Sequence, residues 1–105
     1  METIVNTKDE LINLLQVHRQ SILQFGVKQI GLFGSFVRNE AGKDSDIDFF
    51  IEFYPEQKTF KNFMRLADML EEITGRKIEI ITPQSLNKFI GKYILAQVEY
   101  VPLAA

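Results

Sequence analysis

Two aspartates, Asp46 and Asp48, flank a single isoleucine at the start of a strand-like segment over residues 46–53. Because successive side chains of a strand point to opposite faces, both carboxylates lie on one face, about 7 Å apart along the chain. Carboxylates this close repel each other and take up protons unless a cation or hydrogen-bond donors stabilise them. Magnesium binds a few carboxylate oxygens together with phosphates and water. The pair therefore predicts a site that bridges two such ions for an in-line phosphoryl displacement.

A glycine and a serine, Gly34 and Ser35, precede these aspartates by about ten residues. The glycine lets the backbone approach a ligand closely, and the serine offers a hydroxyl and an N–H at the start of a helical turn. Arg38 follows one turn later, where it either binds a phosphate through two hydrogen bonds or pairs with an acid such as Glu40. Each feature alone is typical of an ordinary turn, but their combination between two strands predicts a phosphate-binding and metal-binding site.

The elements that position these residues follow from the spacing of apolar side chains and from the turn residues. In chain order we expect a helix over 8–25, strands over 27–33 and 46–53, a helix over 58–74, a strand over 77–82, a helical region near 83–97 and a short strand within 98–102. The polar segment 39–45 is predicted to be a loop. This order predicts an α/β or α+β fold with a small mixed β-sheet flanked by helices.

Two of these elements show which of their faces belongs to the core. The strand over 46–53 places its alternating apolar residues opposite the carboxylates, and the helix over 58–74 repeats apolar residues at helical spacing. These core candidates are Ile47, Phe49, Ile51 and Phe53 on the strand and Phe60, Phe63, Ala67, Leu70 and Ile73 on the helix.

Composition excludes several classes of protein. The length of 105 residues predicts one domain over residues 1–105, with room for a single core. A net charge of −2 leaves no basic excess for binding a long nucleic acid. The chain has no cysteine, which excludes disulfides and thiolate chemistry. No stretch approaches the roughly 20 apolar residues of a membrane-spanning helix. We therefore expect a cytoplasmic protein that does not bind membranes.

Three segments resemble a known family. "LFGSFVRNEAGKDSDIDFFIEF" (32–53) resembles the signature of the minimal nucleotidyltransferase (MNT) proteins, which are small members of the DNA polymerase β-like nucleotidyltransferase superfamily found in bacterial and archaeal toxin–antitoxin pairs. "GRKIEIITPQSL" (75–86) is similar to the third-strand segment of that family, and "ILAQVEYV" (94–101) is similar to its C-terminal end. The resemblance covers nearly the whole chain.

The resemblance implies a nucleotidyltransferase fold that binds a nucleoside triphosphate, most simply ATP, with magnesium. It places Gly34 and Ser35 at the phosphates and makes Asp46 and Asp48 metal ligands. The third carboxylate of the family falls at position 79, where aspartate is usual and this chain has Glu79. The implied role of Glu79 is metal ligation and activation of the attacking hydroxyl as a general base. The other interpretation of Glu79 is a solvated strand residue.

The resemblance also implies a partner, a HEPN-domain toxin, which the MNT protein neutralises by transferring AMP to a hydroxyl on it. Two alternatives stay open at the level of sequence. One is an antitoxin that keeps the nucleotide fold but inhibits the toxin by occlusion alone, an interpretation that the Glu79 substitution favours. The other is transfer to a small molecule by a homodimer that builds its acceptor site from two copies.

Overall fold

A four-stranded mixed sheet with helices on both sides organises the chain. The computed structural model describes residues 4–86 and 88–103. Its elements are α1 (Lys8–Val17), α2 (Arg19–Gln24), β1 (Val27–Phe33), η1 (Gly34–Phe36), β2 (Ile47–Phe53), η2 (Pro55–Gln57), α3 (Phe60–Thr74), β3 (Ile78–Ile81), η3 (Pro83–Ser85), α4 (Lys88–Gln97) and β4 (Glu99–Val101), where η marks a single 3₁₀ turn. This architecture confirms the predicted fold class.

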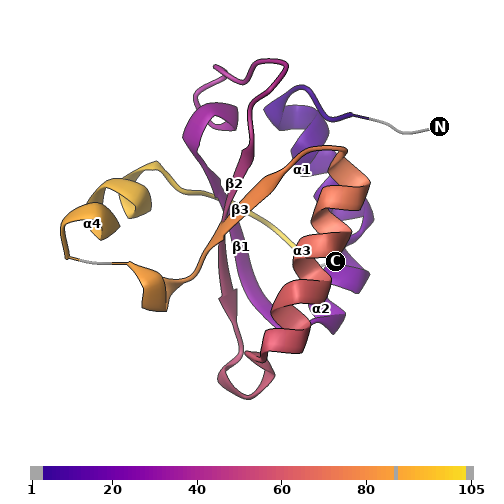
Figure 1. Ribbon diagram of the computed structural model, residues 1–105, viewed down its shortest axis with the longest axis vertical. Helices are drawn as coiled ribbons and strands as arrows, with labels where there is room; N and C mark the ends of the chain where they lie inside the picture. The colour runs from indigo at the N-terminus through magenta and orange to yellow at the C-terminus, as the bar shows by residue number, and fades with distance from the viewer. Residues whose placement is uncertain (1–3, 87, 104–105) are drawn as a thin grey trace.

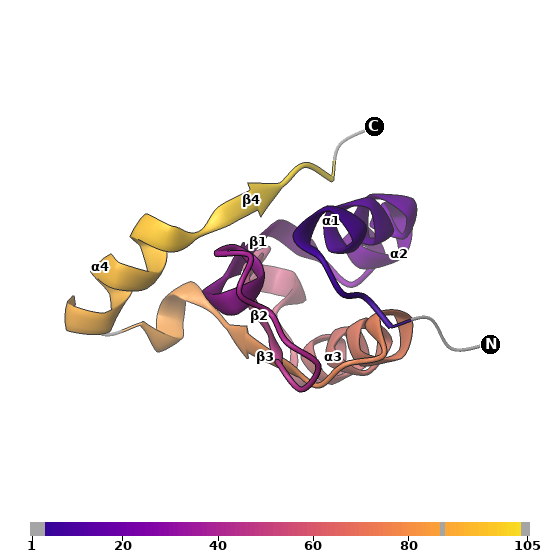
Figure 2. The same ribbon diagram turned by 90° about the horizontal axis from the view of Figure 1, so that it is seen from above.

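The strands lie in the order β3-β2-β1-β4. β1 pairs antiparallel with both β2 and β4, whereas β2 pairs parallel with β3. Helices α1, α2 and α3 cover one face of the sheet, and α4 lies on the opposite side (Figure 1, Figure 2). A parallel pair needs a crossover connection, and α3 supplies the one between β2 and β3. This crossover sets Glu79 of β3 beside β2.

The core fills the space between the sheet and the three helices on its first face. Alternation along β2 confirms the expected inward face, because Ile47, Phe49 and Ile51 are fully buried and Phe53 nearly so. Each such side chain stabilises the fold by about 1.5–3 kcal/mol through burial. The other fully buried side chains of at least valine size are Leu11, Leu15, Ile22, Val27, Ile30, Leu32, Leu66 and Leu70, with Phe36 1% exposed.

Helix α3 is bounded as its sequence predicts, but its buried face is shifted. Thr59 caps its start, with its Oγ1 accepting from the N–H of Asn62 at 3.1 Å, and Gly75 ends it at φ +70. The expected core residue Phe60 is 82% exposed, because it is the first residue of the helix and precedes the turn that meets the sheet. Leu66, which lay outside the expected stripe, is fully buried instead.

Two predicted helices are interrupted. The helix expected over 8–25 divides at His18, whose φ of −97 and ψ of 15 leave the helical region. There the Arg19 side chain donates to the carbonyl of Gln16 at 2.8 Å. The region near 83–97 divides as well, because Leu86 is extended between η3 and α4. The other elements match their predicted positions to within two residues.

Membrane crossing would need a long apolar helix, and none of the helices within residues 4–86 and 88–103 meets that requirement.

Candidate active site

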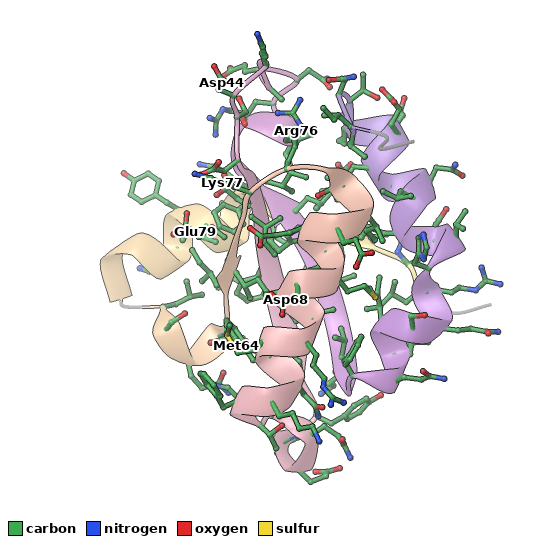
Figure 3. The ribbon with its side chains drawn as sticks, turned by 45° about the vertical axis from the view of Figure 1, so that its right-hand side comes forward. Asp44, Met64, Asp68, Arg76, Lys77 and Glu79 are labelled. Carbon is green, nitrogen blue, oxygen red and sulfur yellow. The ribbon has the colours of Figure 1, made fainter. Side chains whose placement is uncertain are left out.

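Asp48 and Glu79 lie side by side on the sheet face opposite α1, α2 and α3. In the parallel pairing of β2 with β3, Asp48 is the direct partner of Glu79. Asp48 is half-buried and Glu79 is exposed. Figure 3 shows Glu79 pointing away from α3, on the side of the sheet where α4 lies. The pairing brings together two carboxylates that are far apart in the sequence.

The pKa of the Asp48 carboxyl is raised from 3.8 to about 6. Burial is the largest cause, followed by the charge of Glu79, a hydrogen bond between the two carboxyl groups, and the charge of Asp46. The Arg38 guanidinium acts in the opposite direction. The two neighbouring carboxylates therefore disfavour the ionised form of Asp48, and the Arg38 guanidinium favours it.

The turn at Gly34 packs directly against the Asp48 carboxylate. Gly34 has φ +77, a conformation that glycine adopts without strain. A Cβ at this position would lie 2.1 Å from Oδ2 of Asp48, far inside van der Waals contact. Phe33, the residue before the turn, is the antiparallel partner of Asp48, which explains the proximity. The glycine therefore makes room for a carboxylate, a requirement that the sequence did not reveal.

Ser35 follows in the same turn, η1, and is half-buried. Its carbonyl accepts from the N–H of Glu40 at 2.9 Å, and the carbonyl of Gly34 accepts from the N–H of Arg38 at 3.3 Å. These bonds fold residues 34–40 into successive turns that begin at Gly34, beside the Asp48 carboxylate. The expected helical turn after the glycine is confirmed as η1.

Arg38 takes one of the two arrangements that the sequence allowed. Its Nε lies 3.1 Å from Oε2 of Glu40, and its Nη1 donates to Oε1 of Gln97 on α4 at 3.4 Å. The pair with Glu40 is well exposed, so it contributes little to stability. Because Arg38 still lowers the pKa of Asp48, its charge lies within reach of the carboxylates.

Asp46 is placed differently from its neighbour. It precedes β2, is exposed, and lines a cavity of about 390 Å³ that also contacts Lys43, Arg76 and Lys77. Among residues 4–86 and 88–103, no three histidine, cysteine, aspartate or glutamate side chains lie close enough together to hold a metal ion. The structure thus pairs Asp48 with Glu79. A metal site made of these two carboxylates and Asp46 stays a prediction.

Two aromatic side chains cover the sheet face that carries Asp48, further along β2. Phe50 points to the same side as Asp48 yet is only 3% exposed, because Tyr100 of β4 packs edge-to-face against it with ring centroids 6.4 Å apart. Gly31 of β1 lies between them in register, and a Cβ there would meet Val98 at 2.4 Å. The segment after α4 therefore closes one end of the site.

A family model described as a nucleotidyltransferase domain matches residues 15–101. The chain belongs to this nucleotidyltransferase family. Protein adenylyltransferase MntA of Thermococcus cleftensis is 36% identical over 96 residues, which span 90% of this chain and 96% of that protein. The nucleotidyltransferase activity and the MNT resemblance are therefore confirmed, and this chain is an enzyme of that class.

Solved structures of nucleotidyltransferases share the fold of this chain. A candidate minimal nucleotidyltransferase superposes with a TM-score of 0.69 at 26% identity, covering 84% of this chain and 93% of that one. An MNT antitoxin complex with tri-AMPylated HEPN toxin from Shewanella oneidensis has a TM-score of 0.55 at 16% identity, covering 83% of this chain and 71% of that one, a likeness of fold.

One residue at the rim of the site carries no signal in the sequence. Arg76 is buried next to the loop before Asp46, and its partners are almost all main-chain oxygens. A main-chain oxygen is present at every residue, so no pattern of side chains predicts where such contacts form.

Proposed function

We propose that this nucleotidyltransferase moves AMP from ATP onto a hydroxyl of a partner protein, a HEPN-domain toxin, and so acts as the antitoxin of the pair. The observation that carries the proposal is the pairing of the Asp48 and Glu79 carboxylates directly against the Gly34 turn. The adenylyltransferase relative and the fold shared with an antitoxin bound to an AMPylated toxin support the donor and the partner. Because ATP is the donor, the proposal places the protein in the cytoplasm.

The carboxylates fit magnesium, which takes oxygen ligands and tolerates few protein ligands when a phosphate and water complete its shell. Asp46, Asp48 and Glu79 would hold the metal, which we propose to be two magnesium ions. The raised pKa of Asp48 fits this donor set, since burial and the nearby charges of Glu79 and Asp46 all disfavour its ionised form, and a bound cation would favour it. When bound, magnesium supplies positive charge that offsets these carboxylates and the triphosphate.

The groups of the chain itself bind and orient the substrates. The backbone at Gly34 and Ser35 is proposed to meet the phosphates, and Arg38 leaves its exposed pair with Glu40 to bind a phosphate through two hydrogen bonds. Glu79 accepts the proton of the acceptor hydroxyl as that oxygen bonds to the α-phosphorus. The bond from the α-phosphorus to the bridging oxygen breaks, and pyrophosphate leaves with that electron pair.

The test is co-expression of the chain with the HEPN-domain protein that we propose as its partner, followed by mass spectrometry of that protein. A gain of one or more AMP masses is expected with the native chain and is lost with Asp48→Asn. Asp68→Asn is the matched control, because Asp68 is an exposed aspartate on α3, on the other side of the sheet from Glu79 (Figure 3).

The three outcomes of this experiment separate the alternatives. Neutralisation of the toxin without any added AMP would replace the proposal with inhibition by occlusion, the alternative that Glu79 in place of aspartate favours. Adenylylation of small molecules by a dimer, with an unmodified toxin, would assign the enzyme to a different acceptor. Only AMP on the toxin that depends on Asp48 and not on Asp68 supports the proposal.

A further inference from the structure

Arg76 is a buried cation whose charge is met by oxygens that carry no full negative charge. Its side chain is only 8% exposed, and no carboxylate of residues 4–86 and 88–103 forms an ion pair with it. Its acceptors come from two other segments, and the guanidinium carbon also lies 5.1 Å from the centre of the Phe36 ring. The acceptors are the carbonyls of Val5, Gly42 (2.9 Å), Lys43 (3.3 Å) and Ser45 (2.9 Å) and the side-chain oxygen of Asn6 (3.2 Å).

These contacts connect the parts of the candidate site that lie apart in the sequence. Gly42, Lys43 and Ser45 form the loop that leads directly into Asp46 and β2. Phe36 is the last residue of η1, the turn that begins with Gly34 and Ser35. Arg76 itself stands three residues before Glu79, and Figure 3 shows it reaching toward the loop that carries Asp44. The Arg76 guanidinium therefore contacts two parts of the site, the loop before the aspartates and the turn that begins at Gly34. Arg76 itself lies just before β3, the strand that carries Glu79.

The chemistry of the contacts requires arginine. Its planar guanidinium presents five N–H donors in a fixed fork, which lets it donate to several oxygens at once. Lysine has three donors on one nitrogen and a compact, strongly hydrated charge, so it cannot reach the same set of oxygens. Burying a charge is costly unless its donors are satisfied. We therefore expect that replacing the Arg76 guanidinium releases the loop, because a lysine does not make the same hydrogen bonds.

We propose that Arg76 is a positioning residue for nucleotidyl transfer: it holds the Gly42–Ser45 loop and Phe36 together, so that Asp46 and Asp48 face the Gly34–Ser35 turn. The proposal rests on the assignment of these residues to the active site. Arg76 touches no reacting atom in this scheme. It acts by fixing the position of the loop before the aspartates relative to the Gly34–Ser35 turn. A displacement of about 1 Å at a reacting centre lowers the rate about 10²-fold.

Arg76→Lys tests the proposal, because it keeps the charge and removes the fork. In the native protein we expect NMR order parameters of about 0.85 for the backbone of residues 42–46, as for a rigid segment, and below about 0.6 in the variant. With ATP, magnesium and the cognate partner, kcat per folded molecule should fall about 10- to 100-fold. Asn6→Ala, at an exposed position, removes a single acceptor and should produce a smaller change in the same direction.

Leu70→Ala is the control for a general loss of stability, because Leu70 is fully buried in α3 and contacts the core. It should lower the free energy of unfolding while leaving the order parameters of residues 42–46 and kcat per folded molecule within twofold of native. The proposal is overturned if folded Arg76→Lys keeps a rigid loop and native kcat. If Arg76→Lys does not fold, the same null result in Asn6→Ala overturns it.

These readouts also separate this proposal from the proposed function. A native chain that transfers no AMP refutes the function, and the order parameters then decide whether Arg76 holds the loop. A native chain that transfers AMP, with an Arg76→Lys variant of equal rate and rigidity, refutes only the positioning role.

Discussion

Gly34→Ala is the most informative single substitution at this site, because one methyl group would meet a proposed metal ligand. Two separate effects follow from the geometry. The first is backbone strain, since Gly34 has φ +77, which costs a residue with a Cβ about 1–2 kcal/mol. The second is a collision, since the new Cβ would lie 2.1 Å from Oδ2 and 3.0 Å from Cγ of Asp48.

The collision sets the size of the effect on catalysis. Ordinary contact begins at 3.4 Å, so the carboxylate oxygen or the turn must move by about 1.3 Å from its position 2.1 Å away. A displacement of about 1 Å at a reacting centre costs about 10²-fold in rate. We therefore expect Gly34→Ala to lower AMP transfer at least about 100-fold, while the free energy of unfolding falls by only about 1–3 kcal/mol.

Gly26→Ala is a matched control at the other end of β1. Gly26 has φ +83, and a Cβ there would lie 2.1 Å from Cβ of Gln57, which is exposed and outside the site. The backbone strain is therefore similar, and a clash also occurs, here with the Cβ and Cγ of Gln57, but no carboxylate moves. Transfer is measured as incorporation of labelled AMP into the partner at equal folded concentration, with unfolding followed by circular dichroism in urea. If Gly34→Ala transfers AMP within threefold of Gly26→Ala, the contact between the turn and Asp48 is not needed for the chemistry.

Three further predictions follow from the charges at the site. Because the folded-state pKa of Asp48 is raised from 3.8 to about 6, the folded protein binds more protons between these values; stability without magnesium should fall from pH 4 to 6 and level off above it. Partial exposure limits that change to about 1 kcal/mol, and urea titrations should find it absent in Asp48→Asn. Glu79→Gln should keep magnesium-dependent ATP binding by calorimetry but slow transfer about 10²- to 10⁴-fold, whereas Glu79→Asp should stay active; equal rates in all three proteins would contradict a general base. Arg38→Gln should raise the KM for ATP about tenfold and change the free energy of unfolding by less than about 1 kcal/mol, because its pair with Glu40 is exposed; an unchanged KM would exclude a phosphate contact.

The strands and the chemistry of the motif could be predicted because both depend on local patterns. Alternation along 46–53 separates Ile47 and Phe49, which are fully buried, from the carboxylates on the other face. The same local reasoning was wrong about the helix over 8–25, because the apolar spacing continues through His18 while the backbone does not. A side-chain pattern specifies which face is buried, but the caps and hydrogen bonds at a break depend on what the helix packs against.

The sequence alone determined the family, the order of strands and helices and the two aspartates after a glycine–serine turn, because these depend on contiguous residues. Only the tertiary structure decided that Glu79 is the direct partner of Asp48, since the register of a parallel pair depends on how the α3 crossover packs. It also decided that Gly34 accommodates a carboxylate and that Arg76 binds the carbonyls of a distant loop. A backbone oxygen is present at every position, and a glycine does not show in the sequence which group its missing side chain makes room for. These partners therefore become identifiable only when the chain has folded around them.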